Sequence, residues 1–116
     1  MDYKQLKQEF NTPFYIYNFD FIKERFLNLK EAFKARKSQI FYAVKANSNL
    51  SLLQMLANLD SGFDCVSIGE VKRALKAGAK AYKIIFSGVG KTKEELRQAL
   101  EYDILYINLE SEAEMM

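Results

Sequence analysis

The chain has 116 residues, of which 49% are hydrophobic and 28% are charged, a composition typical of a folded globular domain rather than of a disordered tail. This length suffices for one small domain and is short for most two-domain enzymes. Seventeen basic and fifteen acidic residues leave a formal charge of +2, which gives no reason to expect nucleic acid or an acidic membrane surface as a partner.

The cysteine content and the lengths of the apolar runs indicate in which cellular compartment the protein is expected. Cys65 is the single cysteine, so a disulfide within the chain is excluded, and a lone thiol fits a reducing compartment. Residues 1–10 are polar and lack the apolar stretch of a signal peptide. No apolar run approaches the roughly 18 residues of a membrane helix. We therefore expect a cytoplasmic protein without a membrane partner.

The first predicted elements are a strand and a long helix. Pro13 has no N–H to donate to a sheet, which suits the start of an extended segment over Phe14–Tyr17. A helix is predicted next, with Asp20 as its N-cap. Its buried stripe has spacings of 4, 3 and 4, and consists of Ile22, Phe26, Leu29 and Phe33.

Four short apolar runs then predict buried strands, because they are rich in Ile, Val, Phe and Tyr. They begin at residues 40, 63, 84 and 104, so they recur about every 21 residues. The runs are Ile40–Val44, Phe63–Val66, Ile84–Phe86 and Ile104–Leu109.

The segments between these runs have helical spacing. One face of each predicted helix is apolar, made of Leu52, Met55, Leu56 and Leu59, then Val71, Ala74, Leu75 and Gly78, then Leu96, Ala99 and Leu100.

Capping patterns mark the expected helix ends. A hydroxyl residue stands three positions before a glutamate in Ser67–Glu70, Thr92–Glu95 and Ser111–Glu114, which predicts three capping boxes. Gly78 stands where a left-handed residue would end the second of these helices.

Alternating strands and helices predict a parallel sheet with right-handed crossovers, either an open doubly wound sheet or a (β/α)8 TIM barrel. The segment Lys45–Asn49 after the first strand has no glycine, whereas an open dinucleotide-binding sheet has a glycine-rich turn there. We therefore predict an α/β fold that is a partial TIM barrel, about its first four βα units. A complete barrel has eight strands and about 250 residues, so the chain is expected to be truncated.

Lys45 is the first candidate for chemistry. It ends the first predicted barrel strand, and catalytic residues of such barrels gather at the carboxyl ends of the strands. A desolvated lysine amine attacks aldehydes to form a Schiff base. A strand-end lysine that only reaches into water remains the alternative.

Five segments carry a resemblance to a known family. The segment Phe41–Asn49 resembles the lysine motif of the group-IV, alanine-racemase-fold decarboxylases, which depend on pyridoxal phosphate. Phe63–Val71 is similar to the family's second motif. Phe86–Thr92, Asn108–Ser111 and Thr12–Tyr17 resemble segments of the branch that acts on diaminopimelate. The similar segments follow the family's order over essentially the whole chain.

The resemblance implies a set of roles. Lys45 would be catalytic and bind pyridoxal 5′-phosphate, and Asp64 and Glu70 would lie beside the cofactor; no metal is implied. Asp64 could instead cap a loop, and Glu70 could serve only its capping box. Cys65 is not expected to be a nucleophile, because the family's catalytic cysteine belongs to a later segment. Lys91 is expected to be solvated or a dimer contact.

The implied domain organisation has a strand and a helix over residues 1–36 and the first part of the cofactor-binding barrel over residues 37–116, with a C-terminal β-domain absent. The implied reaction is decarboxylation of meso-diaminopimelate to L-lysine by a homodimer, with this piece inactive alone. The family places a histidine against the cofactor, and this chain has none. Alternatives are a decarboxylase of the same fold acting on ornithine, arginine or carboxynorspermidine, a non-catalytic pyridoxal-phosphate-binding barrel, or a gene remnant.

Overall fold

A computed structural model describes residues 2–116. Four strands form one parallel sheet in the order of the sequence: β1 (Phe41–Ala43), β2 (Gly62–Cys65), β3 (Ile84–Phe86) and β4 (Tyr106–Ile107). Each pairing joins residues 21 positions apart: 41 with 62, 63 with 84 and 85 with 106. The parallel sheet and its repeat confirm the predicted partial barrel.

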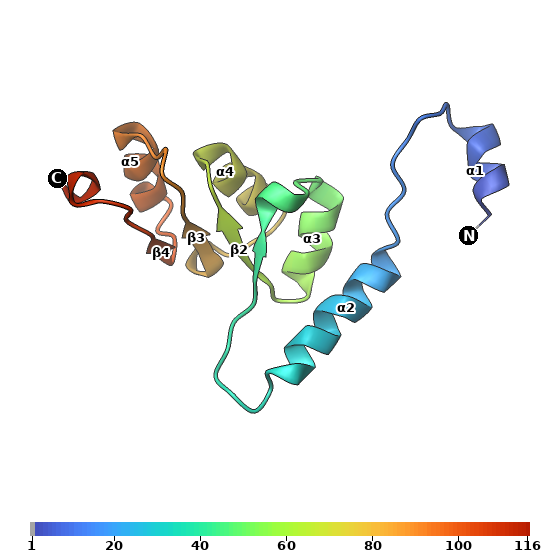
Figure 1. Ribbon diagram of the computed structural model, residues 1–116, viewed down its shortest axis with the longest axis horizontal. Helices are drawn as coiled ribbons and strands as arrows, with labels where there is room; N and C mark the ends of the chain where they lie inside the picture. The colour runs from blue at the N-terminus through green and yellow to red at the C-terminus, as the bar shows by residue number, and fades with distance from the viewer. Residues whose placement is uncertain (1) are drawn as a thin grey trace.

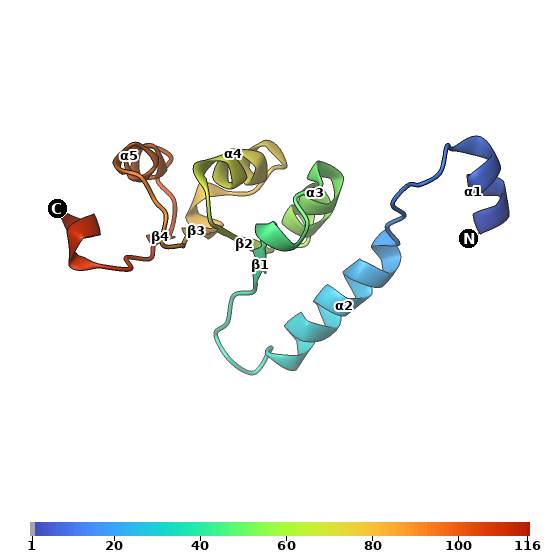
Figure 2. The same ribbon diagram turned by 45° about the horizontal axis from the view of Figure 1, so that its top comes forward.

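Three helices cover one face of this sheet (Figure 2). They are α3 (Leu50–Asn58), α4 (Ile68–Lys76) and α5 (Lys93–Glu101). Along each strand, alternate side chains point to opposite faces. The helix-facing residues are fully buried and include Phe63, Cys65, Ile84 and Phe86. They pack on Leu53 and Leu56 of α3, Val71 and Ala74 of α4, and Ala99 of α5.

The predicted helix faces are confirmed in α3 and α4 and only partly in α5. Leu52 and Leu56 are buried, as are Val71 and Ala74. Leu100 was expected in the buried face of α5, but it is 69% exposed. In this helix Ala99 is the buried core residue, and Leu96 of the predicted face is only partly buried.

The helix caps differ in how well the sequence predicted them. Thr92 forms a complete capping box with Glu95, as predicted. The Ser67 hydroxyl accepts from the Glu70 N–H, but the Glu70 carboxylate accepts from Val66 instead of Ser67. The prediction for Ser111 was wrong: a short 3₁₀ helix, η3 (Glu112–Met115), begins there without a side-chain cap.

A left-handed residue follows three helices, Asp60 after α3, Gly78 after α4 and Asp103 after α5. Gly78 follows α4 with φ +99°, and the two N–H groups at Gly78 and Ala79 donate to Leu75 and Ala74, which is the predicted left-handed termination. Asp60 takes the corresponding place after α3 with φ 69°. Aspartate tolerates this conformation better than most residues.

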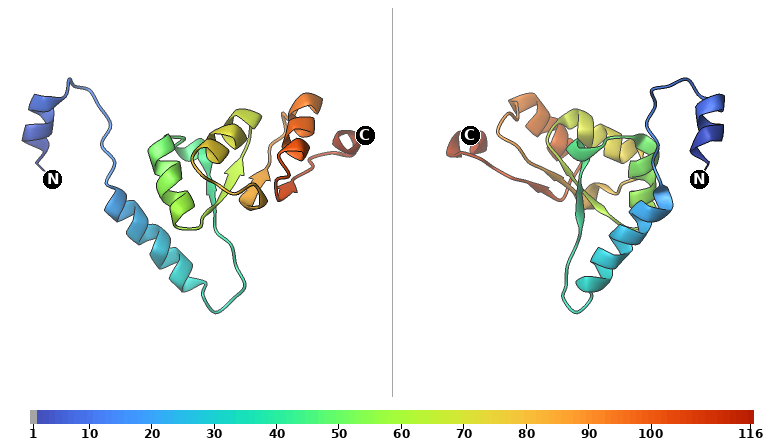
Figure 3. Two further views of the ribbon diagram at one scale, coloured as in Figure 1. Left: turned by 180° about the vertical axis from the view of Figure 1, so that it is seen from behind. Right: turned by 45° about the vertical axis from the view of Figure 1, so that its right-hand side comes forward.

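The N-terminal region departs from the prediction. A helix, α1 (Tyr3–Glu9), precedes the segment Phe14–Tyr17, which is extended but forms no strand, because no strand among residues 2–116 pairs with it. The segment Phe14–Tyr17 is therefore extended but unpaired among residues 2–116, and the division of the chain at residue 36 stays a prediction. Figure 1 shows α1 standing away from the sheet, and Figure 3 shows the two termini at opposite ends of the molecule. The radius of gyration, 16.9 Å, exceeds the roughly 13 Å of a compact domain of similar length.

The predicted long helix is α2 (Phe19–Ala32), which packs beside α3. Its N-cap is Asn18 rather than Asp20: the Asn18 side chain accepts from the Phe21 N–H at 3.1 Å. The earlier start lets Phe19 pack against the core. The expected stripe is buried only in its first half, at Ile22 and Phe26, while Leu29 and Phe33 are 46% and 49% exposed.

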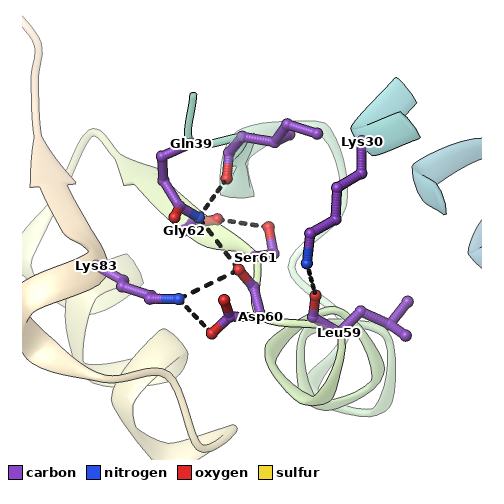
Figure 4. A network of polar contacts seen from close by, with 8 residues as sticks. Lys30, Gln39, Leu59, Asp60, Ser61, Gly62 and Lys83 are labelled. Atoms are coloured by element: carbon purple, nitrogen blue, oxygen red, sulfur yellow. Dashed lines mark hydrogen bonds and ion pairs between the residues drawn. The ribbon is translucent and has the colours of Figure 1, made fainter. Parts of the chain in front are cut away.

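A polar network ties the amino ends of the strands together (Figure 4). Lys83 pairs with the Asp60 carboxylate, and Gln39 donates to the Asp60 carbonyl at 3.1 Å. Lys30 of α2 donates to the Leu59 carbonyl at 3.3 Å. We call these residues, Lys30, Gln39, Asp60 and Lys83, the amino-edge network. It holds α2 and the starts of β1 and β3 to the turn between α3 and β2.

Candidate functional site at the carboxyl edge of the sheet

Lys45 lies at the carboxyl edge of the sheet, as expected for a parallel array. β1 is shorter than predicted, and a 3₁₀ turn, η1 (Val44–Ala46), carries Lys45 out of the strand. Val44 is completely buried, whereas the Lys45 side chain is exposed. The buried valine therefore anchors the turn and leaves the amine accessible.

The loop after Lys45 is fixed from several sides. The Tyr42 hydroxyl donates to the Asn47 carbonyl at 3.0 Å, and burial raises the pKa of Tyr42, so it remains a donor at neutral pH. Arg73 of α4 donates to the Ser48 carbonyl at 3.2 Å. The Asn49 side chain caps α3 by accepting from Ser51 and Leu52. These contacts give the turn that carries Lys45 a defined position.

Asp64 is the second predicted site residue, and it belongs to a row of polar side chains that crosses three strands. The Ser87 hydroxyl donates to the Asp64 carboxylate at 2.9 Å. The Asn108 side-chain amide donates to the same Ser87 oxygen at 2.8 Å. Asp64 lies in β2, and the other two residues directly follow β3 and β4. We call Asp64, Ser87 and Asn108 the carboxyl-edge row.

Glu70 has a structural role at the start of α4. Its carboxylate accepts from the Val66 N–H at 2.8 Å, and its own N–H donates to the Ser67 hydroxyl at 3.1 Å. These bonds satisfy backbone groups at the helix start and account for Glu70 without chemistry. They also hold its carboxylate close to the carboxyl end of β2.

The elements that carry the three predicted residues meet at this edge. Ala43 of β1 pairs in register with Asp64 of β2, and Lys45 follows Ala43 by two positions. The turn η1 contacts both β2 and α4. Lys45, Asp64 and Glu70 therefore come from three adjoining elements.

The Cys65 thiol faces the helices and is fully buried. Burial, with smaller contributions from the charges of Glu70 and Asp64, raises its pKa to about 12. The thiol is therefore protonated at neutral pH and is a poor nucleophile, which agrees with the sequence analysis.

Lys91 corrects an expectation. The sequence predicted a solvated side chain or a dimer contact, but the Lys91 side chain is completely buried. Its ammonium lies 3.3 Å from the Glu114 carboxylate and donates to the Gly88 carbonyl. A buried ammonium needs such partners. The pair ties η3 to the loop after β3.

Sequence reasoning missed how Ser87 and Asn108 act together. Each lies in a segment that resembles the family, Phe86–Thr92 or Asn108–Ser111, but the resemblance does not link the two residues. They are 21 positions apart, the same separation as the paired strand residues, so they occupy equivalent places on β3 and β4. The 21-residue spacing was the sequence signal from which their side-by-side position could have been predicted.

Two structural features are absent from residues 2–116. No helix there is long and apolar enough to cross a membrane. No cluster of three His, Cys, Asp or Glu side chains in this range could hold a metal ion.

The carboxyl edge fits an aldehyde cofactor in the chemistry of its groups. Lys45 offers an exposed primary amine, the group that condenses with an aldehyde. Asp64, half-buried and hydrogen-bonded by Ser87, supplies a fixed carboxylate on the neighbouring strand. A lysine at the carboxyl edge of a parallel βα array is typical of a βα-barrel protein whose active site lies at the carboxyl ends of the strands.

Comparison with known proteins identifies the family. Residues 19–116 match the pyridoxal-binding domain of the pyridoxal-dependent decarboxylases, and the chain belongs to this family. A diaminopimelate decarboxylase of Helicobacter pylori strain J99 is 64% identical over 114 residues, which is 98% of this chain and 28% of that protein. The chain therefore spans little more than a quarter of the length of this relative.

Solved structures show the same relationship. The crystal structure of diaminopimelate decarboxylase from Helicobacter pylori complexed with L-lysine has a TM-score of 0.92 and 64% identity, over 95% of this chain and 28% of that one. A lysine decarboxylase from Selenomonas ruminantium has a TM-score of 0.88 and 27% identity, over 97% of this chain and 30% of that one. Both likenesses extend over nearly the whole described chain.

Proposed function

We propose that this chain supplies the cofactor-holding lysine, Lys45, to a decarboxylase that converts meso-diaminopimelate to L-lysine and carbon dioxide. The observation that carries the proposal is the position of Lys45, exposed on a buttressed turn at the carboxyl edge within the part of the chain that matches the family. The 64% identity to a diaminopimelate decarboxylase favours this substrate.

Pyridoxal phosphate supplies an electron sink for the carbanion left when carbon dioxide departs. The residues of this chain bind and orient. Lys45 would hold the cofactor covalently through its amine. Asp64 would present a carboxylate to the cofactor from β2, and Glu70 would set the start of α4 next to it. The loop fixed by Tyr42 and Arg73 would keep Lys45 in place.

The organisation of the intact protein is part of the proposal. Residues 37–116 would form the first part of a cofactor-binding barrel, residues 1–36 would lead into it, and a β-domain would complete the enzyme. We propose a homodimer in the cytoplasm, as the family resemblance implies. The chain has no histidine for the cofactor ring, which supports the view that it is inactive alone.

The test begins with the native polypeptide that contains Phe41–Asn49, whose mass should be measured directly from source cells. We expect a product several times heavier than 13.5 kDa that releases carbon dioxide from meso-diaminopimelate. A product of 13.5 kDa without that activity would contradict the proposal and favour a remnant or a non-catalytic cofactor-binding protein.

A second substrate assignment has one observation in its favour, the likeness to a lysine decarboxylase at 27% identity. Decarboxylases of ornithine, arginine or carboxynorspermidine with the same fold are further rivals. Parallel assays with diaminopimelate, lysine, ornithine, arginine and carboxynorspermidine separate them. A kcat/KM for any other substrate above that for diaminopimelate would overturn the substrate assignment.

A further inference from the structure

We infer that Ser87 and Asn108 are positioning residues, which orient the Asp64 carboxylate for the cofactor held by Lys45. This inference rests on the proposed function and deepens it. It starts from the carboxyl-edge row, in which the Asn108 amide, the Ser87 hydroxyl and the Asp64 carboxylate are joined by bonds of 2.8 and 2.9 Å.

The proton positions in the row follow from the chemistry of its groups. An ionised carboxylate only accepts hydrogen bonds, so the Ser87 hydroxyl must donate its single proton to Asp64. The Ser87 oxygen is then an acceptor toward Asn108, which must present its NH₂ group rather than its carbonyl. The row therefore has one direction, with all donation running toward Asp64.

The backbone fixes the row in place. The Ser87 N–H donates to the Cys65 carbonyl at 2.8 Å, and the Asn108 N–H donates to the Phe86 carbonyl at 2.9 Å. Both bonds extend the sheet ladder one residue beyond the strands. Because the main chain at each position is held, the two side chains orient Asp64 without reorganisation.

Asp64 depends on this row for its orientation. No side chain other than Ser87 donates to the Asp64 carboxylate among residues 2–116. The carboxylate is half-buried, so one fixed oxygen determines where the second one points. A charge-assisted bond of this kind is stronger than a neutral one.

A purely structural role is the rival, in which the row only joins β2, β3 and β4. Reversing the direction of hydrogen-bond donation along the row distinguishes the two roles. In the double variant Asp64→Asn/Asn108→Asp, the amide at 64 donates to Ser87, and Ser87 donates to the carboxylate at 108. The hydrogen bonds are restored, but the negative charge moves from β2 to the end of β4.

The experiment uses the native polypeptide that contains this chain, with pyridoxal 5′-phosphate as the probe. Three quantities are measured: the dissociation constant of the cofactor, the pH midpoint of its absorbance when bound, and the urea midpoint of the cofactor-free protein. Borohydride trapping followed by mass spectrometry identifies the labelled lysine. The variants are Ser87→Ala, Ser87→Thr and Asn108→Asp, with the double variant, and Ser111→Ala serves as a matched control, because the Ser111 side chain forms no cap hydrogen bond.

We expect Ser87→Ala and Asn108→Asp to weaken cofactor binding about 10-fold, as loss of a supporting partner does in other sites, and to shift the pH midpoint. Ser87→Thr keeps the hydroxyl and should bind like the parent, as should Ser111→Ala. The double variant should regain the urea midpoint but not the cofactor affinity.

Unchanged affinity and pH midpoint in Ser87→Ala and Asn108→Asp would overturn the inference, and so would recovery of affinity in the double variant. If Asn108→Asp does not fold, Asn108→Ala removes the donor without adding charge and decides the same question. Failure of the proposed function looks different, because in that case the parent protein itself would show no label at Lys45.

Discussion

The two edges of the sheet use the same kinds of residue for different purposes. At the amino edge, the ammonium of Lys83 and that of Lys30 bind an aspartate and a backbone carbonyl. At the carboxyl edge, Lys45 is exposed and forms no ion pair with residues 2–116, while Asp64 is oriented by neutral donors. At the amino edge both ammonium groups are thus bonded within the structure, whereas at the carboxyl edge the Lys45 amine stays accessible, although Lys91 pairs with Glu114 there. This is the division expected of βα barrels, in which one edge stabilises and the other reacts.

The largest expected effect comes from Lys45→Ala in the native polypeptide. Loss of the amine should lower decarboxylase activity on the order of 10³-fold or more, the range for a positioned catalytic group. The free energy of unfolding should change by less than about 0.5 kcal/mol, because the side chain is exposed. Assays of kcat and urea unfolding check both parts. A large loss of stability would show that Lys45 is structural and would break the contrast between the edges.

Gly62→Ala tests the amino edge. A Cβ at Gly62 would lie 2.5 Å from Phe41 Cδ1 and 3.0 Å from the Lys83 carbonyl, so the ring and the backbone at Lys83, just before β3, would have to move. We expect a loss of about 1–3 kcal/mol in the free energy of unfolding, as for other overpacked sites. Gly90→Ala is the matched control, because nothing lies within 4 Å of its Cβ. Equal stability of the two variants in urea unfolding would contradict this prediction.

Thr92→Ala sharpens the comparison, since Thr92 stands near the carboxyl edge but only caps α5. Removal of the complete capping box should cost about 1 kcal/mol of stability and leave the cofactor affinity unchanged. Ser111→Ala is the control, because that hydroxyl caps no helix. Thermal unfolding and cofactor titration measure the two quantities. Weaker cofactor binding in Thr92→Ala would contradict the prediction that Thr92 only caps α5 and does not support the cofactor site.

The smallest expected effect comes from Asp60→Asn, which removes the charge facing Lys83 but keeps a residue that tolerates the left-handed conformation. The hydrogen bond from Lys83 lowers the pKa of Asp60 from 3.8. The stability that it contributes is thus present above about pH 4 and is lost as the pH falls through the folded value. The carboxylate is exposed and screened, so we expect a loss of about 0.2–1 kcal/mol at neutral pH.

This difference between Asp60→Asn and the parent should shrink as the pH falls below about 4, because Asp60 is protonated first in the unfolded state and at lower pH in the folded state. Urea unfolding at about pH 7 and about pH 3 tests the sign. A difference that grows toward low pH would contradict the assigned interaction with Lys83.

The sequence predicted the parallel array well because its signals are local and repeated. Apolar runs at a regular spacing and the hydroxyl–glutamate pair at Thr92 each specify a structure within a few residues. The N-terminal region was harder to predict, because a strand needs a partner, and no local pattern tells whether one is present. Asn18 and Asp20 are equally good caps by residue type, so packing of Phe19 decided between them.

The sequence points to candidate site residues, whose roles stay predictions, but not to the contacts between them. Lys45 ends the first apolar run, whereas Asp64 was expected beside the cofactor only because of the family resemblance. The link from Asp64 to Ser87 and Asn108 depends on the register between strands, which the sequence shows only through the 21-residue spacing. The burial of Lys91 depends on Glu114, 23 positions away, and charge composition gives no sign of it.

The constant separation of paired strands also affects how the chain folds. Every pairing in the sheet closes a loop of the same length, 21 residues, and spatial order follows chain order. The entropy cost of loop closure depends on loop length, so the fourth strand joins at no greater cost than the second. We expect each βα unit to add to the sheet as it leaves the ribosome.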